Sequence, residues 1–551
     1  MRAVGAPAEA SGRDDVRVPP GSEPLGTSRK RVLCMATDEF TAGPRSGYRT
    51  DSVTAAAGAA EDGEVVRLAG RVVLWRRMGG LIFGHIQDRA GRVQVSLSRD
   101  ELGVDTFQEW ARAVKIGDFV GVTGKLYTTR RGERTVGASE LVVLNRTVRA
   151  LPDKWLGLSN VEARLRRRYL DLLVNNDSRE RFRIRARTIS RIRRFLDDND
   201  FLEVETPMLQ EAASGAAARP FITHHNALGE DFYLRISPET FLKRVVVGSL
   251  DRVYELGRNF RNEGMDPSHL QEFTMLEWYA AYWDYRDNMR FVREMILAVL
   301  DDVFGSRTVT YGGVKLDFGA EWPELDYRAE VARHSGIDLT VVRDLPTLRA
   351  RIAELGLEVD DAASYAGLVD LLYKKTVRPH LIQPCFLLHH PAELVPLARR
   401  SDSDPSQLDM FQVVVNGWEL VKAYSELVDP VEQRRRLEEQ AELRAAGDDE
   451  TMMLEEDFIE AMEYGMPPMS GLGIGIDRLI ALLTDAPTLR EVVLFPLMRD
   501  SRRGRTDPTA TGADDSADGD DSADGKDSAA SAETVGSADI AGASVEAADP
   551  V

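Results

Sequence analysis

Hydrophobic and polar residues alternate in short runs between residues 65 and 144, and turn-forming residues separate the runs. Alternation with a period of two is typical of strands that bury one face. A segment with helical character, 106–114, precedes the fourth run. The pattern therefore predicts a small five-stranded barrel, with strands at 65–74, 81–87, 93–97, 119–126 and 134–144.

The order of these elements matches an OB-fold, a barrel that commonly binds single-stranded nucleic acid on one face. A structural or protein-binding barrel has the same strand pattern, so the pattern by itself leaves both roles open. On the second strand Leu81 and Phe83 share one face. Phe83 is therefore either an exposed aromatic residue or part of the barrel core.

The chain changes character after the barrel. Hydrophobic residues recur at helical spacing over 178–198 with arginines between them, which predicts a helix with one buried and one basic face. Between 201 and 495, strand-like and helical segments are mixed without a regular βαβ alternation, and no glycine-rich phosphate loop occurs. We therefore expect an α+β domain in which helices flank an antiparallel sheet.

Composition separates the two ends of the chain from its body. The N-terminal stretch is rich in Gly, Pro, Ala and Ser, and the acidic C-terminal stretch is of low complexity, so we expect both to be disordered. The predicted parts are a disordered extension at 1–60, the barrel at 61–150, a linker at 151–177, the α+β domain at 178–500 and a disordered tail at 501–551.

Charge and cysteine content exclude few classes of protein or partner. The tail carries more than half of the formal net charge of −20, so this charge does not exclude a nucleic-acid partner. The sequence has no secretory signal and no run of about 18 apolar residues, which favours a cytoplasmic protein without a membrane span. Cys34 and Cys385 have no metal-ligand spacing, and neither do His224 and His225.

A pair of strands predicted at 253–261 and 272–279 carries residues that are unusual in a plain core. Phe273, Glu277 and Tyr279 share one face of the second strand, because side chains alternate along it. An aromatic ring, a carboxylate and a phenol on one face suit a small-molecule site, with an exposed hairpin as the alternative.

Three segments in order resemble the motifs of class II aminoacyl-tRNA synthetases. Residues 260–273 resemble motif 2, 471–478 resemble motif 3, and 201–207 resemble motif 1, the usual dimer-forming segment. Within that class, 212–221 and 235–239 resemble the lysyl enzymes more than the aspartyl and asparaginyl ones. The resemblance implies a cytoplasmic homodimer that activates L-lysine with ATP and Mg²⁺ and then transfers it to tRNA(Lys).

The resemblance also implies roles for individual residues. The catalytic pair would be Arg261 and Arg478, which would offset the repulsion between the substrate carboxylate and the α-phosphate of ATP. The implied ATP-binding residues are Arg261, Glu263, His269, Phe273, Glu419 and Arg478. The implied lysine-binding residues are Gly215, Glu239, Glu277, Tyr279, Tyr424 and Glu426. Of these, Glu239 and Glu426 would pair with the ε-ammonium, since a buried cation needs such partners.

Two further sets follow from the same resemblance. The metal ligands would be Glu419 and Gln412, of which Gln412 replaces a carboxylate expected for Mg²⁺ and could bind only through its neutral carbonyl oxygen. The residues that read the tRNA anticodon would be Arg77, Phe83, Gln94 and Glu140.

The sequence departs from the family pattern near the expected ATP site. Leu270 and Gln271 replace Asn and Pro of the motif 2 loop, and Lys422 replaces an Asn. In one regular strand Glu419 and Lys422 would face opposite ways, and a bulge between them would change this.

Two other functions fit the sequence. The substitutions permit a nucleic-acid-binding protein built on an inactive synthetase, which the retained Arg261, Glu263, Glu419 and Arg478 oppose. The second is an enzyme that attaches a lysine-like group to a protein, as a barrel-less relative does, and the barrel of this chain opposes it.

Overall fold

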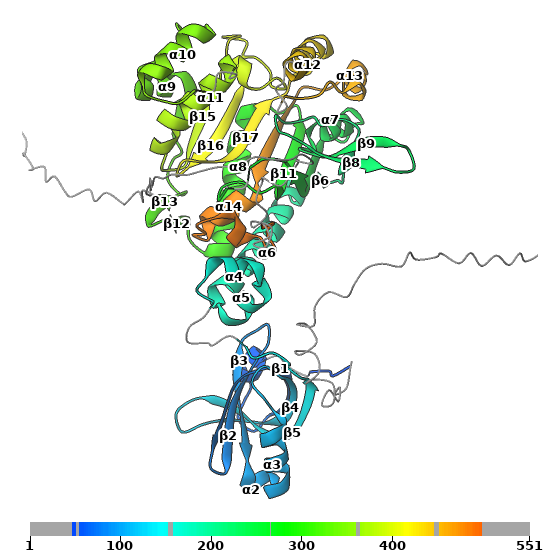
Figure 1. Cartoon of the computed structure of the whole chain (residues 1–551), viewed down its shortest axis with the longest axis vertical. Coiled ribbons are helices and arrows are strands. Elements are labelled where there is room, and N and C mark those ends of the chain that lie inside the picture. The colour runs from blue at the N-terminus through cyan, green and yellow to red at the C-terminus, as the bar shows by residue number, and fades with distance from the viewer. Residues whose placement is uncertain are drawn as a thin grey trace, which may run out of the picture. The chain divides into compact units, whose positions relative to one another are not determined.

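The computed structural model describes residues 47–50, 54–151, 158–264, 266–359, 364–445 and 451–498. A β-barrel precedes a larger α+β region (Figure 1). The predicted disordered tail lies outside the described residues, and so does most of the predicted disordered N-terminal extension.

The barrel has five strands, as the alternation predicts. The strands are β1 (Val65–Met78), β2 (Leu81–Gln87), β3 (Arg92–Ser98), β4 (Phe119–Thr128) and β5 (Arg134–Asn145), accompanied by the helices α1 (Thr54–Ala59), α2 (Arg99–Leu102) and α3 (Val104–Ala113). They close in the order β1-β2-β3-β5-β4. Alternate side chains such as Leu68, Val95 and Val122 point inward and are almost fully buried, and Phe107 of α3 packs into the same core.

Two domain boundaries differ from those predicted. Ordered structure begins before residue 61, because Ala57 of α1 is buried in the barrel core and the guanidinium of Arg67 lies 4.3 Å from the ring centroid of Tyr48. The predicted linker contains the helices α4 (Val161–Arg166) and α5 (Arg168–Val174). Arg168 and Asp171 are fully buried there and form an ion pair at 2.7 Å. Their charged residue types concealed this packing from the sequence pattern.

An eight-stranded, mostly antiparallel sheet organises the second region, as predicted. Its strands are β14 (Glu324–Asp326), β15 (Cys385–Leu388), β16 (Met410–Val415), β17 (Trp418–Ser425), β18 (Met469–Gly475), β11 (Glu272–Ala281), β10 (Arg252–Phe260) and β6 (Leu202–Glu203), in that spatial order. Only its first and last pairs, β14/β15 and β10/β6, are parallel. The two smaller sheets consist of β7 (Leu209–Gln210), β8 (Phe221–His225) and β9 (Glu230–Leu234), and of β12 (Thr308–Tyr311) and β13 (Val314–Asp317).

Helices accompany the large sheet. They are α6 (Asn176–Asp197), α7 (Glu239–Val247), α8 (Tyr285–Val299), continued by a π-helical turn (Leu300–Phe304), α9 (Tyr327–Ser335), α10 (Leu345–Glu354), α11 (Tyr365–Thr376), α12 (Pro430–Ala445), α13 (Glu456–Glu463) and α14 (Ile476–Leu483), with 3₁₀ turns at Arg378–His380, Ala392–Leu394 and Leu489–Val492. No helix in the described ranges is long and apolar enough to cross a membrane.

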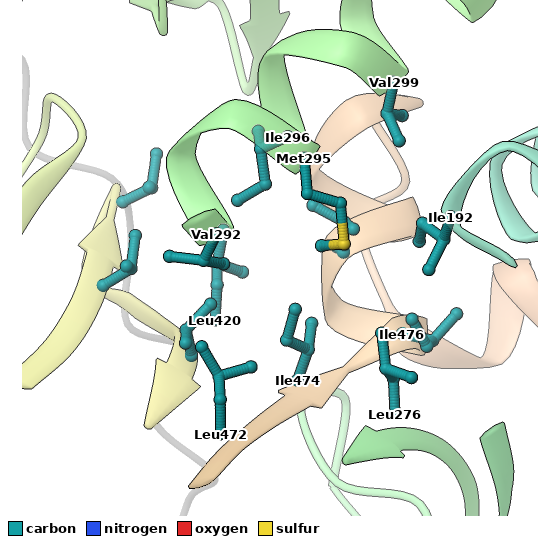
Figure 2. Packing of buried hydrophobic residues seen from close by; sticks show 14 of the residues in the cluster. Ile192, Leu276, Val292, Met295, Ile296, Val299, Leu420, Leu472, Ile474 and Ile476 are labelled. Atoms are coloured by element: carbon teal, nitrogen blue, oxygen red, sulfur yellow. The ribbon is translucent and has the colours of Figure 1, made fainter. Parts of the chain in front are cut away.

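The main core lies between the sheet and α8. This helix starts at a capping box, in which Asp284 accepts bonds from the first-turn amides and Asp287 accepts one from the Asp284 amide. Val292 and Ile296 of its apolar face belong to the same buried cluster as Ile474 of β18 (Figure 2). Because side chains alternate along the strands, burying one face of the sheet in this way leaves the other face available for a site.

Candidate active site

A cavity of about 280 Å³ lies on the face of the sheet opposite this core. Strand β11 supplies one wall with Phe273, Met275, Glu277 and Tyr279, whereas Leu276 between them belongs to the main core. The face that the sequence pattern singled out is thus the cavity face. The remaining walls come from the turn before α7, the loop between β10 and β11, and strands β17 and β18.

A β-bulge decides which residues of β17 reach this cavity. Val413 of β16 pairs with Val421, but Val414 pairs with Glu419, so Leu420 is an extra residue in β17. The extra residue puts Glu419 on the same face as Lys422 and Tyr424, and all three line the cavity. The sequence left this parity open, and the structure resolves it through the bulge.

The ends of motifs 2 and 3 meet at one end of the cavity. Arg261 directly follows β10, and its guanidinium carbon lies 5.1 Å from the ring centroid of Phe273. Its buried Nε has no hydrogen-bond partner among the described residues, and burial lowers the pKa of Arg261 while Glu263 and Glu277 oppose this. A guanidinium that lacks an anion inside a cavity is suited to bind one.

Arg478 reaches the same end from the first turn of α14. It donates to the backbone oxygen of Glu419 at 3.2 Å, and its guanidinium lies 3.5 Å from Nε2 of His269. The other ring nitrogen of His269 contacts Asp266 at 2.7 Å. Arg261 and Arg478 provide two fixed cations, and the Phe273 ring provides an aromatic surface. This combination suits a nucleoside triphosphate.

Acidic and phenolic side chains occupy the other end. Glu277 accepts hydrogen bonds from Ser237 at 2.8 Å and from Tyr279 at 3.0 Å, and Glu239 accepts one from Tyr424 at 2.6 Å. Burial, followed by the charge of Glu239, raises the pKa of Glu277 from 4.5 to about 8. Carboxylate and phenol oxygens gathered in this way are suited to accept hydrogen bonds from ammonium groups.

Two glycines give this end its shape. Gly215 has a left-handed φ of +81°, and a Cβ there would lie 3.1 Å from Cβ of Glu239. At Gly471 a Cβ would overlap both the Tyr279 ring and Oε1 of Glu426. Both positions therefore need glycine.

Glu426 lies behind this wall and does not line the cavity itself. One of its oxygens, Oε2, contacts Nζ of Lys243, a fully buried lysine that also bonds Glu239 at 2.7 Å. The sequence pattern gave no prediction for Lys243; it stands four residues after Glu239, a spacing that places the two side chains on one face of α7.

The expected metal site contains one carboxylate. Gln412 donates from Nε2 to Glu419 at 2.7 Å and lies outside the cavity lining. Among the described residues, no group of three His, Cys, Asp or Glu side chains is arranged to hold a metal ion. Mg²⁺ usually takes one or two protein carboxylates together with substrate phosphates and water, so Glu419 fits an ion that is held mainly by ATP.

The two residues that depart from the family pattern in the loop between β10 and β11 both make contacts within the fold. Gln271 is buried and donates from its amide to the backbone oxygen of Gly264 at 2.9 Å. Leu270 lines the cavity and packs against the main core. The loop therefore keeps its closure with different side chains, while Leu270 adds an apolar surface to the cavity.

On the barrel, Phe83 lies outside the core, partly exposed on the outer face of β2. Two residues on, His85 contacts Oε1 of Glu133 at 2.8 Å, and Gln94 of β3 donates to Oε2 of the same carboxylate at 2.8 Å. Glu133 is half-exposed in the turn between β4 and β5. Polar groups and an aromatic ring thus share this outer face.

The other two barrel residues lie elsewhere. Arg77 pairs with Ile82, so it takes the inward-facing parity, and its guanidinium lies 5.4 Å from the ring centroid of Phe107. Glu140 is exposed opposite Thr123, five residues beyond the partner of Gln94 in β5. The structure brings Phe83 and Gln94 to one face with Glu133 and His85, and not with Arg77 or Glu140. Sequence reasoning did not single out Glu133. The one feature that could have indicated it is its position directly before the fifth predicted strand.

A closed OB-type barrel, followed by a mostly antiparallel sheet whose cavity is lined by arginines and carboxylates, is the architecture of class II aminoacyl-tRNA synthetases. The family described as tRNA synthetases class II (D, K and N) matches residues 160–499, and the OB-fold nucleic acid binding domain matches residues 66–144. The chain belongs to this class II family.

Individual relatives show which members of this family the chain is similar to. The lysine–tRNA ligase of Chloroflexus aurantiacus is 46% identical over 462 residues, which cover 83% of this chain and 94% of the relative. The lysine–tRNA ligases of Carboxydothermus hydrogenoformans (45% identity, 79% and 89% coverage) and Moorella thermoacetica (47% identity, 80% and 89% coverage) match similarly.

Proposed function

We propose that this chain is a lysine–tRNA ligase, which activates L-lysine with ATP and transfers it to tRNA(Lys). The observation that carries the proposal is the polarity of one cavity. Glu239 and Glu277 line the part of the cavity that also holds Tyr279 and Tyr424, while Arg261 and Arg478 line the part beside Phe273 and His269. Lysine has ammonium groups on both sides of its aliphatic stem and a carboxylate that must meet the α-phosphate of ATP.

The side chains support an activation step by positioning and charge compensation. Arg261 would hold the substrate carboxylate against the α-phosphate, and Arg478 would hold the triphosphate from the far side. A carboxylate oxygen then forms a bond to the α-phosphorus, and the bond to the β-phosphate oxygen breaks with release of pyrophosphate. Mg²⁺ bound with ATP would neutralise phosphate charge beside Glu419.

Selection of lysine would rest on the acidic end. Glu277 and Gly215 would receive the α-ammonium, Tyr279 and Tyr424 would flank the stem, and Glu239 with Glu426 would compensate the ε-ammonium. An aspartate substrate would meet like charge at Glu239 and Glu277 here, because the nearby Lys243 is already paired with Glu239 and Glu426.

The transfer step needs tRNA, and the barrel supplies a surface for it. Phe83 would stack on an unpaired anticodon base, while Gln94 and Glu133 would bind base edges. The ribose hydroxyl at the 3′ end of the tRNA would then attack the adenylate carbonyl and release AMP. We also propose a cytoplasmic homodimer formed through motif 1 around Pro207, which sedimentation of the full chain tests.

Two assays on the full chain test the proposal. We expect pyrophosphate exchange that depends on lysine and not on aspartate, and aminoacylation of tRNA(Lys). Exchange without aminoacylation would point to the lysylation of a protein, and the loss of both would leave a nucleic-acid-binding protein. Neither alternative is favoured, because the relatives that carry the ligase name match both domains of the chain.

Replacement of Glu426 by Gln tests the acidic end directly. Loss of a charge-assisted bond worth about 1.5–3 kcal/mol should lower lysine-dependent exchange by about tenfold or more. Unchanged lysine affinity in this variant would remove Glu426 from the binding site.

A further inference from the structure

Lys243 is the only basic residue buried against the acidic end of the cavity in the part of the chain that the structure describes. It lies one helical turn after Glu239 on α7, and its side chain is completely buried. Its Nζ bonds Oε1 of Glu239 at 2.7 Å and contacts Oε2 of Glu426. A buried ammonium is costly to desolvate, so its position between two carboxylates calls for an explanation.

The surroundings of Lys243 are otherwise aromatic. The ring centroids of Tyr424, Phe458 and Tyr279 lie 5.6, 5.8 and 5.9 Å from Nζ. Helix α13, which contributes Phe458, has no charged group on this ammonium. The carboxylate just before that helix, Glu455, is engaged by Arg244 at 3.3 Å and by Ser214.

Lys243 contacts one carboxylate oxygen of Glu239 and one of Glu426. Oε1 of Glu239 is used twice, since it also accepts the Tyr424 hydroxyl at 2.6 Å. Oε1 of Glu426 is buried and has no hydrogen-bond partner within the described ranges. That free oxygen lies against Gly471, which lines the cavity.

Three glutamates and one lysine determine the net charge of the acidic end. Glu239, Glu277 and Glu426 bring three negative charges when ionised, and Lys243 cancels one of them. Two negative charges are left, and free lysine carries two ammonium groups. The substrate carboxylate is outside this count, because under the proposed function it would meet Arg261, which lines the same cavity.

We propose that Lys243 is a specificity-determining positioning residue, an internal ammonium that sets the charge of the acidic end to match the two ammonium groups of lysine. It touches no substrate and acts through Glu239 and Glu426, and it thereby fixes which carboxylate oxygen is offered to the ε-ammonium. This inference rests on the proposed function, because it takes lysine as the substrate.

Before lysine binds, burial raises the pKa of Glu277 to about 8 and favours its protonated form, so the count applies once lysine is bound and the carboxylates are ionised. Burial raises the pKa of Glu426, and the charge of Lys243 opposes that rise. Burial tends to lower the pKa of Lys243, but Glu239 and Glu426 outweigh it and raise the pKa above its ordinary value. Without Lys243, the three carboxylates would retain an additional proton, which lysine would have to displace.

Calorimetry on the full chain tests the proposal. L-lysine is titrated into the wild type and into Lys243→Met in two buffers of different ionisation enthalpy, which measures the protons released on binding. We expect the variant to release about one additional proton per lysine and to bind lysine about tenfold more weakly near neutral pH, with recovery as the pH rises. ATP affinity should not change.

A double variant guards against simple loss of folding. Lys243→Met with Glu239→Gln removes one charge of each sign and leaves the two negative charges of Glu277 and Glu426. It should bind lysine more tightly than Lys243→Met alone, with the proton release of the wild type. Lys374→Met, which breaks an exposed Lys–Asp pair of the same spacing, is the matched control.

The outcomes separate the two proposals. If the wild type lacks lysine-dependent exchange, the proposed function fails and this inference fails with it. If the wild type is active and Lys243→Met melts at a lower temperature but keeps wild-type lysine affinity and proton release, Lys243 only stabilises the fold and this inference alone is overturned. If the single variant does not fold, extra proton release by the double variant overturns it as well.

Discussion

At the scale of single residues, Gly471 of the acidic end leaves no room for a side chain. Gly471 lies against both the Tyr279 ring and the free oxygen of Glu426, so one methyl group there would displace a residue on each side. Gly475, further along the same strand, has its nearest prospective contact at 3.8 Å, the side chain of Arg478. The two glycines therefore form a matched pair for substitution.

We expect Gly471→Ala to raise the KM for lysine by about tenfold or more, because overpacking a closed site costs about 1–3 kcal/mol. The KM for ATP should stay close to that of the wild type, since Gly471 is remote from Arg261 in the cavity wall. Steady-state pyrophosphate exchange measures both constants. Gly475→Ala is the control for lysine, and an equal rise in lysine KM in both variants would contradict this expectation.

The raised pKa of Glu277 has a consequence for stability. Its ordinary value is 4.5 and its value in the folded chain is about 8, so the folded state holds a proton that the unfolded state has released. The stabilising contribution of this proton is complete below about pH 4.5 and is lost as the pH rises towards 8.

Without substrates, the wild type should therefore lose more thermal stability between pH 6 and 9 than Glu277→Gln does. Glutamine keeps the shape of the side chain and removes its titration, and Glu426 is present in both proteins. Melting curves at several pH values measure the difference. Parallel pH dependence in the two proteins would show that Glu277 titrates normally.

At the scale of elements, the bulge between β16 and β17 places Glu419, the carboxylate that the proposal sets beside Mg²⁺. The extra residue Leu420 turns Glu419 into the cavity, where the neutral amide of Gln412 supports it from the neighbouring strand. A regular pairing would put Glu419 on the core side, where a carboxylate is costly.

Gln412→Glu should lower the Mg²⁺ concentration that gives half-maximal exchange, because a second carboxylate beside Glu419 adds charge to the site. Glu419→Gln is the opposite change and should raise that concentration. Mg²⁺ titrations at fixed ATP measure both. If Gln412→Glu leaves the Mg²⁺ dependence of the wild type unchanged, Gln412 lies too far from the metal to serve as a ligand.

At the scale of the whole molecule, the proposal places adenylate formation and anticodon binding on different domains. All cavity residues belong to the α+β domain, whereas Phe83, Gln94 and Glu133 belong to the barrel. Adenylate formation and tRNA binding should therefore respond to different substitutions.

Phe83→Ala should lower kcat/KM for tRNA by about fivefold or more, since stacking on a base contributes about 1–3 kcal/mol. Lysine-dependent exchange and the melting temperature should stay unchanged, because Phe83 lies outside the barrel core. Phe119→Ala, which truncates another partly exposed aromatic residue of the barrel, is the control. Equal loss of charging in both variants would point to a general effect on the barrel.

The sequence predicted the order of elements well because that order follows from local periodicity. Alternation located the strands of the barrel and the cavity face of β11, and the resemblance located the ends of motifs 2 and 3. The two helices within 151–177 were not predicted, because Arg168 and Asp171 are residues expected at a surface and become buried only by pairing with each other.

By itself, the sequence determined which side chains share a face of a regular strand and which residue types are available for lysine and ATP. Only the tertiary structure decided that Glu419 enters the cavity, that Glu133 lies beside Gln94, and that Lys243 bridges Glu239 and Glu426. The physical reason is the range of the interactions. Periodicity acts over a few residues, whereas a bulge, a turn contact and a buried ion pair depend on segments that are distant in the chain and meet only after folding.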